Sequence, residues 1–294
     1  MAFMSLNGID VSYDKKKQIL KGLNLEVEEG ELVSLLGPSG CGKSTTLRVV
    51  AGFIDPQGGT FTLDGEDMTK VPVHKRQFGL VFQSYALFPH LSVYDNVAFG
   101  LRTRKMDKDV IDKKVKEILE VCGLTELADR FPKQMSGGQR QRIGIARAII
   151  LKPEIIICDE PVSALDVSIQ AQILNLLSDL QKQFGLTYIF IAHGLPTVQH
   201  ISSHVAVMYL GRIVEMADKV TLFSHPMHPY TEGLMAAVPI PDPAFRTDAA
   251  PLLEGDMPSP TNLPEGCRFH PRCKYCQEKC RHESPELRDV GNGH

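Results

Sequence analysis

A chain of 294 residues can bury a full hydrophobic core and can hold one large domain or a domain with an appendage. Its 32 basic and 35 acidic side chains leave a net charge of -3 without a long basic run, which argues against nucleic acid as a ligand. No apolar stretch reaches the roughly 18 residues that span a bilayer, and the first residues, MAFMSLNGIDVSYDKKK, lack the apolar centre of a signal peptide. We therefore expect a soluble, cytoplasmic protein with free thiols at Cys41, Cys122 and Cys158.

Strand-like and helical patterns alternate along most of the chain. Residues 6–36 contain the β-type runs LNGIDVSY, LNLEVEEG and ELVSLL, and a glycine-rich turn then leads into the helical stretch TTLRVVAGF. After the strand FGLVFQ, apolar residues spaced three and four apart predict a mostly helical insert at about 91–131. Then come the helix GGQRQRIGIARAII, the buried strand EIIICDE, the helix VSIQAQILNLLSDLQKQF, the strand LTYIFIAH and the hairpin SHVAVMYLGRIVE. This alternation predicts an α/β fold with a largely parallel sheet, and eight prolines after residue 240 indicate an irregular extension.

The stretch GPSGCGKS, residues 37–44, matches the pattern of a phosphate-binding loop between a strand and a helix. Glycines at 37, 40 and 42 let successive backbone N–H groups turn toward phosphate oxygens at the start of a helix. Lys43 would reach the β and γ phosphates of a nucleotide, and the Ser44 hydroxyl would bind Mg²⁺. The alternative is a glycine-rich turn with a surface lysine.

Two further stretches carry groups suited to phosphate chemistry. The strand IIICDE ends in two carboxylates, of which Asp159 suits Mg²⁺ and Glu160 suits a general base for water, although solvated acids also end many strands. The stretch MSGGQRQR begins a predicted helix, where Ser136 and Gly138 would present a hydroxyl and backbone amides to an anion. The alternative there is a helix-capping serine followed by a flexible glycine pair.

The ordered set GPSGCGKST, Gln83 after LVF, MSGGQ, IIICDEP, SALD and IAH resembles the ATP-binding subunit of an ABC transporter over roughly residues 4–240. The resemblance implies an α/β P-loop NTPase cassette, residues 1–240, with a mostly helical insert at about 84–150, and an irregular Cys-bearing C-terminal extension, residues 241–294. Cassettes of this family close head to tail in pairs, so it also implies a second cassette, identical or related. The other implied partners are transmembrane permease subunits and, indirectly, an extracytoplasmic substrate-binding protein, with this chain on the inner face of the membrane.

The resemblance also implies a role for individual residues, with ATP and Mg²⁺ as cofactors. Tyr13 would stack on adenine, Gln83 would sense Mg²⁺ and the attacking water, Asp166 would link the two cassettes, and His193 would hold the γ-phosphate. Without the resemblance, the alternatives for these four are a strand-end tyrosine, an unremarkable polar glutamine, a helix cap and a structural histidine. The implied sets are, for ATP, Tyr13, Gly37, Ser39, Gly40, Cys41, Gly42, Lys43, Ser44, Thr45, Ser136, Gly137, Gly138, Gln139 and Asp166; for hydrolysis, Glu160, His193 and Gln83; and for Mg²⁺, Ser44, Gln83 and Asp159.

The chain departs from the family pattern at two positions. Met135 stands where leucine is common, and the similar size and polarity of the two side chains should make this exchange tolerable. Gly194 stands where an aspartate commonly follows the histidine. That aspartate is not a phosphate ligand in the family, so we expect activity to survive.

The resemblance to importers differs between the two parts of the chain. The first part, especially RQFGLVFQSYALFPHLSVYDNVAFGL, is similar to ATPases of polyamine and ferric-iron importers. The later part, including EPVSALDVSIQAQILNLL and GCRFHPRC, is similar to those of dipeptide, oligopeptide and nickel importers, and we expect a peptide importer. The alternatives are an importer of another small solute, a soluble ABC ATPase not coupled to transport, and a cassette that only regulates a partner.

Four cysteines crowd into CRFHPRCKYCQEKC with the spacing C-x5-C-x2-C-x3-C, close enough to enclose one metal centre. Peptide-importer ATPases with this tail can carry an iron–sulfur cluster, so the resemblance implies [4Fe–4S] at Cys267, Cys273, Cys276 and Cys280. Tetrahedral zinc and four free thiols are the alternatives. His270 would be a substitute ligand or part of a tight FHPR turn.

Overall fold

The computed structural model describes residues 2–14, 17–192, 194–237, 255–259, 262–291 and 293–294, and within them a six-stranded sheet forms the centre of the molecule. Five strands are parallel, and the edge strand β10 is antiparallel to β9. The strands follow one another across the sheet in the order β10 (Arg212–Asp218), β9 (His204–Tyr209), β3 (Leu32–Leu36), β8 (Thr187–Ile191), β7 (Ile155–Asp159) and β6 (Phe78–Phe82). The largely parallel sheet predicted from the sequence is confirmed, and its β-branched runs are buried because both faces are covered.

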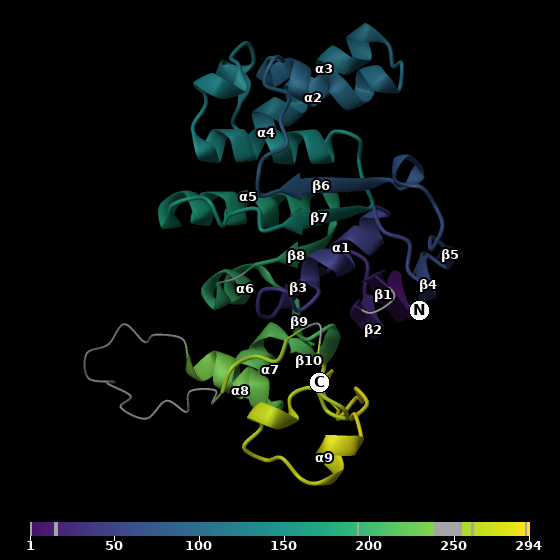
Figure 1. The fold of residues 1–294 in the computed structure, drawn as a ribbon. Coiled ribbons are helices and arrows are strands. Elements are labelled where there is room, and N and C mark those ends of the chain that lie inside the picture. Colours follow the sequence, from purple (N-terminus) through teal and green to yellow (C-terminus); the bar gives the residue numbers. More distant parts are fainter. Residues whose placement is uncertain (1, 15–16, 193, 238–254, 260–261, 292) are drawn as a thin grey trace, which may run out of the picture.

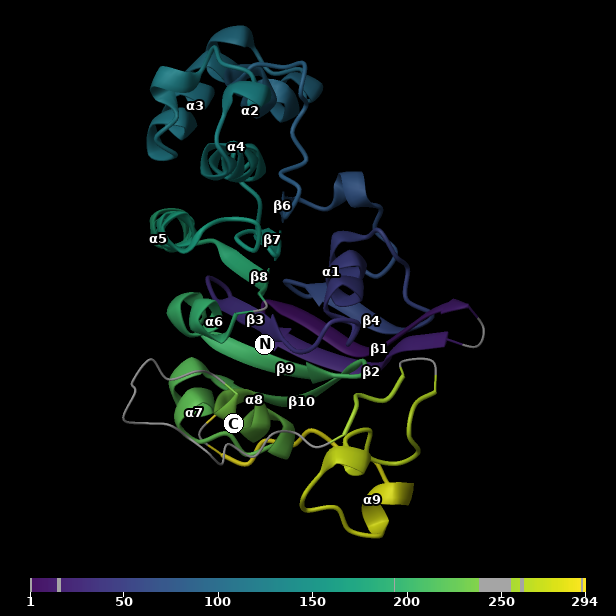
Figure 2. The same cartoon turned by 60° about the vertical axis from the view of Figure 1, so that its left-hand side comes forward.

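The first two strands of the chain form a second, antiparallel sheet with β4 and β5. Its order β2-β1-β4-β5 comprises Lys17–Val27, Met4–Asp14, Gly58–Leu63 and Glu66–Asp67. Helix α1 (Lys43–Ala51) and this sheet share one hydrophobic cluster with one face of the central sheet, and α4 (Gly137–Ile149), α5 (Val167–Phe184) and α6 (Leu195–Ile201) pack on the other face (Figure 2). The sequence predicted the early strands without separating them into a sheet of their own.

The predicted helical insert contains α2 (Val93–Thr103) and α3 (Lys108–Val121), followed by the short 3₁₀ turns Thr125–Leu127 and Pro132–Gln134. The apolar residues of α2 and α3 lie three and four positions apart and pack into the same cluster as α4, which explains why this segment is helical. In Figure 1 these helices form one end of the molecule, next to α4. Another 3₁₀ turn, Val73–Lys75, precedes β6.

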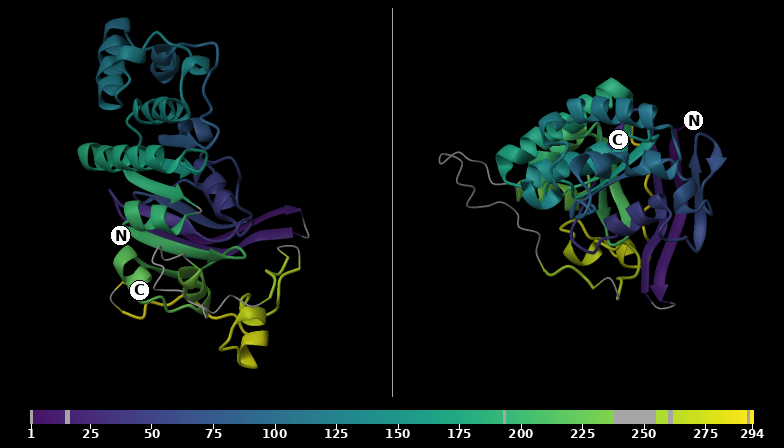
Figure 3. Two further views of the ribbon diagram at one scale, coloured as in Figure 1. Left: turned by 90° about the vertical axis from the view of Figure 1, so that its left-hand side faces the viewer. Right: turned by 90° about the horizontal axis from the view of Figure 1, so that it is seen from above.

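The C-terminal segment lies at the opposite end, beyond β10. Helices α7 (Lys219–Ser224) and α8 (Pro229–Ala236) follow β10 directly. Residues 262–291 then form turns with the 3₁₀ turn His270–Arg272 and the short helix α9 (Lys279–His282), and Figure 3 shows this tail on the far side of the sheet from α2 and α3. No helix among the residues that the structure describes is long and apolar enough to cross a membrane.

Candidate nucleotide site

The carboxyl ends of four parallel strands meet at one edge of the central sheet. Hydrogen-bond register aligns the last residues of β8, β7 and β6, namely Ile191, Asp159 and Phe82, with Leu35, the penultimate residue of β3. Gln83 and Glu160 therefore follow at the level of Leu36, which directly precedes the phosphate loop. Register alone brings together groups that are 120 residues and more apart in the chain, at the edge where α/β sheets bind ligands.

The phosphate loop has the backbone that the sequence predicted. Gly40 and Gly42 have φ values of +79° and +112°, and Gly42 directly precedes the first residue of α1. A Cβ atom on Gly42 would lie 2.7 Å from a methyl group of Leu20, so no larger residue fits there. Lys43 is buried within the loop, where its ammonium donates to the carbonyl oxygens of Gly37 at 2.7 Å and Pro38 at 2.9 Å. A buried cation beside helix N–H groups fits a nucleotide phosphate.

The neighbours of Lys43 line the same loop. Ser39 is exposed, Ser44 is half-buried, and Cys41 and Thr45 are buried. Burial raises the pKa of the Cys41 thiol, so this side chain stays neutral and packs as a small apolar group.

Tyr13 is held beside the loop by its hydroxyl group. That oxygen lies 3.4 Å from Oγ1 of Thr45 and accepts a hydrogen bond from Arg48 at 3.4 Å. Half of the side chain stays exposed, which leaves an aromatic surface open. This placement suits the predicted stacking on adenine, which remains a prediction.

The stretch MSGGQ forms the start of α4. The Ser136 hydroxyl accepts the N–H of Gln139, and the Gln139 side chain accepts the N–H of Ser136, which is a complete capping box. A Cβ atom on Gly138 would lie 2.5 Å from Cγ2 of Ile169, so glycine is required for close packing against α5. Gly137 is half-buried beside Leu165. In Figures 1 and 2 this helix lies with α2 and α3, apart from α1, so one chain does not bring MSGGQ onto its own phosphate loop.

The two carboxylates at the end of β7 are half-buried at the sheet edge. Glu160 has a φ of +50°, rare for a residue with a side chain, and its N–H donates to the carbonyl of Ile191 at 3.2 Å. Such strain persists where surrounding structure fixes the backbone, and it is frequent at functional sites. The predicted Mg²⁺ and base roles of Asp159 and Glu160 fit this position but are not tested by it.

The remaining predicted residues differ in what the structure says of them. Gln83 is exposed directly after β6. Asp166 caps α5, and hydrogen bonds from the Ile169 N–H and the Ser168 hydroxyl lower the pKa of its carboxyl group. His193 lies outside the described residues. Met135 is buried in the core, as a leucine would be.

Comparison with known proteins decides the family. Residues 20–163 match the family model described as ABC transporter, and residues 214–280 match that of the oligopeptide/dipeptide transporter C-terminal region. The chain is 45% identical over 287 residues to a probable peptide ABC transporter ATP-binding protein of Sinorhizobium fredii, covering 93% of this chain and 80% of that protein. It is 44% identical to the oligopeptide transport ATP-binding protein OppF of Salmonella typhimurium, over 93% and 85% of the two chains. The chain belongs to the ABC transporter ATP-binding proteins.

A solved structure agrees with this assignment. The structure of cbiO1 from Clostridium perfringens, described as part of the ABC transporter complex cbiONQ, is 30% identical in sequence and superposes with a TM-score of 0.72. It covers 76% of this chain and 91% of its own. The predicted cassette fold is confirmed, and this ABC protein is an ATPase, since hydrolysis of ATP with Mg²⁺ characterises the family.

The four tail cysteines of this ABC ATPase gather without forming a metal site. The Cys267 N–H donates to the Cys280 carbonyl at 2.9 Å, and burial, followed by the neighbouring thiols, raises the pKa of Cys273. Within the described residues, no three His, Cys, Asp or Glu side chains have an arrangement that would hold a metal. The four sulfur donors themselves are of the type that soft metals prefer. His270 begins the tight 3₁₀ turn that the sequence analysis preferred for it.

The other three cysteines are buried free thiols, as the sequence analysis expected. Burial raises the pKa of Cys122 to about 12, and that of Cys158 rises for the same reason. Both thiols are therefore neutral core groups.

The sequence analysis predicted the hairpin of β9 and β10 but missed that its turn contacts the phosphate loop. The Gly211 N–H donates to the Cys41 carbonyl at 2.7 Å, and a Cβ atom on Gly37 would lie 2.3 Å from the carbonyl oxygen of Met208. The hairpin therefore packs against the backbone of the phosphate loop. Leu210 is unusual in such a turn, where asparagine, aspartate or glycine is typical, and the sequence has no local signal for the contact with the loop.

Proposed function

We propose that this ABC ATPase powers an importer of di- and oligopeptides. The observation that carries the proposal is the match of residues 214–280 to the C-terminal region of oligopeptide and dipeptide transporters. Relatives at 40–45% identity whose names include peptide transport or import support the same cargo. We divide the chain accordingly into an ATP-binding domain, residues 1–240, and a Cys-bearing extension, residues 241–294.

Each residue of the sheet edge has a part in the proposed cycle. The loop N–H groups and Lys43 bind the phosphates of ATP, and Ser44, Asp159 and Gln83 hold Mg²⁺. Glu160 accepts a proton from water as the water oxygen bonds to the γ-phosphorus. The bond between that phosphorus and the bridging oxygen breaks, and ADP leaves. No covalent intermediate on the protein is required, because positioning and charge stabilisation dominate phosphoryl transfer.

A second cassette completes each site in this proposal. Its MSGGQ stretch, with the exposed Ser136 at the start of α4, covers the γ-phosphate. Asp166 links the two cassettes, and His193 holds the γ-phosphate. ATP closes the pair and hydrolysis reopens it. Permease subunits in the membrane use this movement, a substrate-binding protein outside delivers the peptide, and the chain works on the inner face of the membrane.

Copurification tests the cargo. The tagged chain is purified from its native membranes in mild detergent, and the bound permease and binding protein are identified by mass spectrometry. Peptide-type partners support the proposal and show whether the second cassette is a copy of this chain. Partners of the polyamine or ferric-iron type would reject it in favour of the alternative cargo that residues 83–135 suggest.

We also propose that Cys267, Cys273, Cys276 and Cys280 bind a metal centre, a [4Fe–4S] cluster or, alternatively, zinc. The electrostatic influence of the other three thiols on Cys273 supports the proposal, because it requires them to lie near one another. A bound metal would have to draw the thiols into a tighter set. Iron, sulfide and zinc are measured in protein purified without oxygen, with Cys273→Ser as the comparison; equal and negligible metal in both proteins would reject the proposal.

A further inference from the structure

The turn between β9 and β10 is a backbone feature that a small change would disturb. Leu210 and Gly211 occupy its two central positions with φ values of +44° and +79°. A leucine is strained in this left-handed region, so other contacts must hold it there. Gly211 is packed tightly as well, since a Cβ atom on it would lie within 2 Å of the carbonyl oxygen of Ile19.

This turn contacts the phosphate loop at more than one point. In addition to the hydrogen bond from Gly211 to Cys41, a Cβ atom on Gly42 would lie 3.5 Å from Cα of Gly211. Backbone packs directly on backbone here, without a flexible side chain between the two segments. A displacement of the turn would therefore change the shape of the loop.

Arg268, from the Cys-bearing tail, holds the turn in place. Its side chain is almost fully buried, and Nη1 donates a hydrogen bond to the carbonyl oxygen of Leu210. A Cβ atom on Gly211 would lie 3.2 Å from the same nitrogen. A charged donor on the carbonyl of a strained residue is a strong contact.

The next residue of the tail anchors Arg268. Phe269 is buried among Tyr209, Tyr230 and His228, with its ring edge-on to Tyr209 at a centroid distance of 5.3 Å. Aromatic packing of this kind fixes the backbone that carries the Arg268 side chain.

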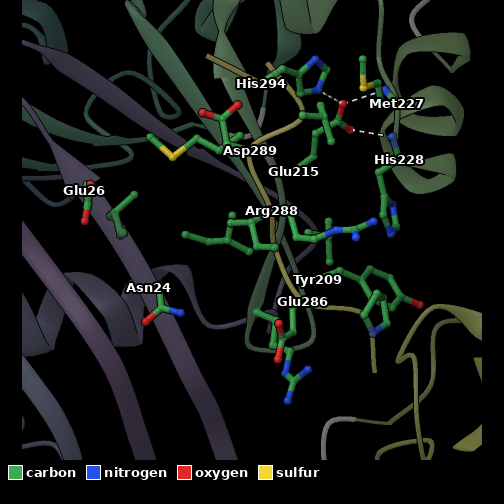
Figure 4. Close-up of a pocket in the computed structure, with 18 of the residues that line it drawn as sticks. Asn24, Glu26, Tyr209, Glu215, Met227, His228, Glu286, Arg288, Asp289 and His294 are labelled. Atoms are coloured by element: carbon green, nitrogen blue, oxygen red, sulfur yellow. Dashed lines mark hydrogen bonds and ion pairs between the residues drawn. The ribbon is translucent and has the colours of Figure 1, made fainter. Parts of the chain in front are cut away.

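The end of the tail is fastened to β10 as well. The buried Glu215 carboxylate accepts the N–H groups of Met227 and His228 and pairs with His294 at 2.6 Å (Figure 4). These contacts line a cavity of about 1050 Å³ between β2, β10 and the tail. The described residues of the tail are therefore packed against the rest of the ATPase.

We propose that Arg268 is a positioning residue for ATP binding, which holds the Leu210–Gly211 turn against the phosphate loop. The packing of the tail on this turn then determines the affinity of the phosphate loop for nucleotide. Arg268, next to Cys267 in the chain, donates to the Leu210 carbonyl, and the N–H of the following residue, Gly211, donates to Cys41 in the phosphate loop. The inference rests on ATP binding alone and is independent of the cargo and of any metal in the tail.

Substitution of Arg268 tests the proposal in the assembled complex. Arg268→Gln removes the cation, and we expect the KM for ATP to rise about tenfold while kcat stays within about twofold. Arg268→Lys keeps a charged donor and should restore most of the affinity. Arg281→Gln is the matched control, since Arg281 lies in the same tail and its guanidinium group pairs with Glu278 at the surface. An unchanged KM in a folded Arg268→Gln protein, with or without a lower Tm, would overturn the proposal.

A second measurement requires no variant and so remains decisive if Arg268→Gln does not fold. Coupling between two sites is reciprocal, so ATP must stabilise the tail if the tail supports ATP binding. Amide hydrogen exchange of residues 267–273 in the full chain should slow about threefold with ATP but not with AMP, which lacks the β and γ phosphates. Equal exchange with ATP and AMP would overturn the proposal.

Discussion

The nucleotide edge and the Cys-bearing tail both collect distant side chains, but by different means. At the edge, four buried parallel strands end in register, so Glu160 and Gln83 are placed by backbone hydrogen bonds that extend through the core. In the tail, short turns carry the cysteines, and the anchors are the side chains of Arg268 and Phe269. We therefore expect the edge to keep its backbone structure when a functional side chain is removed. The tail, in contrast, should depend on a few side chains for its structure.

The largest effect should come from the edge. Glu160→Gln keeps the size and the backbone contact with Ile191 but removes the base, so ATP hydrolysis in the assembled complex should fall about a thousandfold. ATP binding should remain close to that of the unaltered protein, since the loop is untouched. Hydrolysis is measured as phosphate release and binding by equilibrium titration; hydrolysis at an unaltered rate would contradict the proposed role.

In the tail, removal of one anchor should instead cost stability. Phe269→Ala leaves a cavity among Tyr209, Tyr230 and His228 and should lower the free energy of unfolding by about 3 kcal/mol in chemical denaturation. Tyr275→Ala is the control, because 58% of this tail side chain is exposed, and its effect should stay within about 0.5 kcal/mol. Similar losses for the two variants would show that the tail has no specific anchor at Phe269.

Two glycines of the phosphate loop separate backbone strain from crowding. Both have positive φ values, but a Cβ atom on Gly42 would meet Leu20 at 2.7 Å, whereas one on Gly40 would meet nothing within 4 Å. Gly40→Ala should therefore cost about 1 kcal/mol of stability through strain, and Gly42→Ala about 2 kcal/mol through strain and crowding. Denaturation of both variants measures the difference. Equal losses would mean that Leu20 moves aside.

The same contrast explains what could be predicted from the sequence. The strand IIICDE and the loop GPSGCGKS contain their own local signals, so the strand and the glycine-rich turn before a helix could be predicted from the sequence. The contact of Gly211 with the phosphate loop was not predicted. The hairpin turn and Cys41 are far apart in the sequence, so their contact leaves no local pattern. Cysteine spacing in the tail indicated that the thiols are near one another but not how the turns orient them. The separate antiparallel sheet was missed for a related reason, since alternation reveals a strand but not its partner, such as the pairing of β1 with β4.

The smallest expected effect concerns the ion pair that joins the start of β3 to β9, outside both regions. His204 at the start of β9 contacts Glu31 just before β3, and the hydrogen bond to Glu31 raises the pKa of the histidine, with Asp218 adding a weaker attraction. A raised pKa means that the fold favours the protonated ring. The stabilisation is therefore complete below the unfolded pKa of about 6.5 and is lost as the pH rises through the higher folded value.

His204→Gln should thus lower the Tm at pH 6 more than at pH 9. The loss at pH 6 should stay below about 1 kcal/mol, because 39% of the side chain is exposed and solvent screens the pair. His74→Gln, at an exposed position, controls for the removal of an imidazole ring. A difference in Tm that is constant with pH, or that grows toward pH 9, would show that His204 contributes through packing and not through its charge.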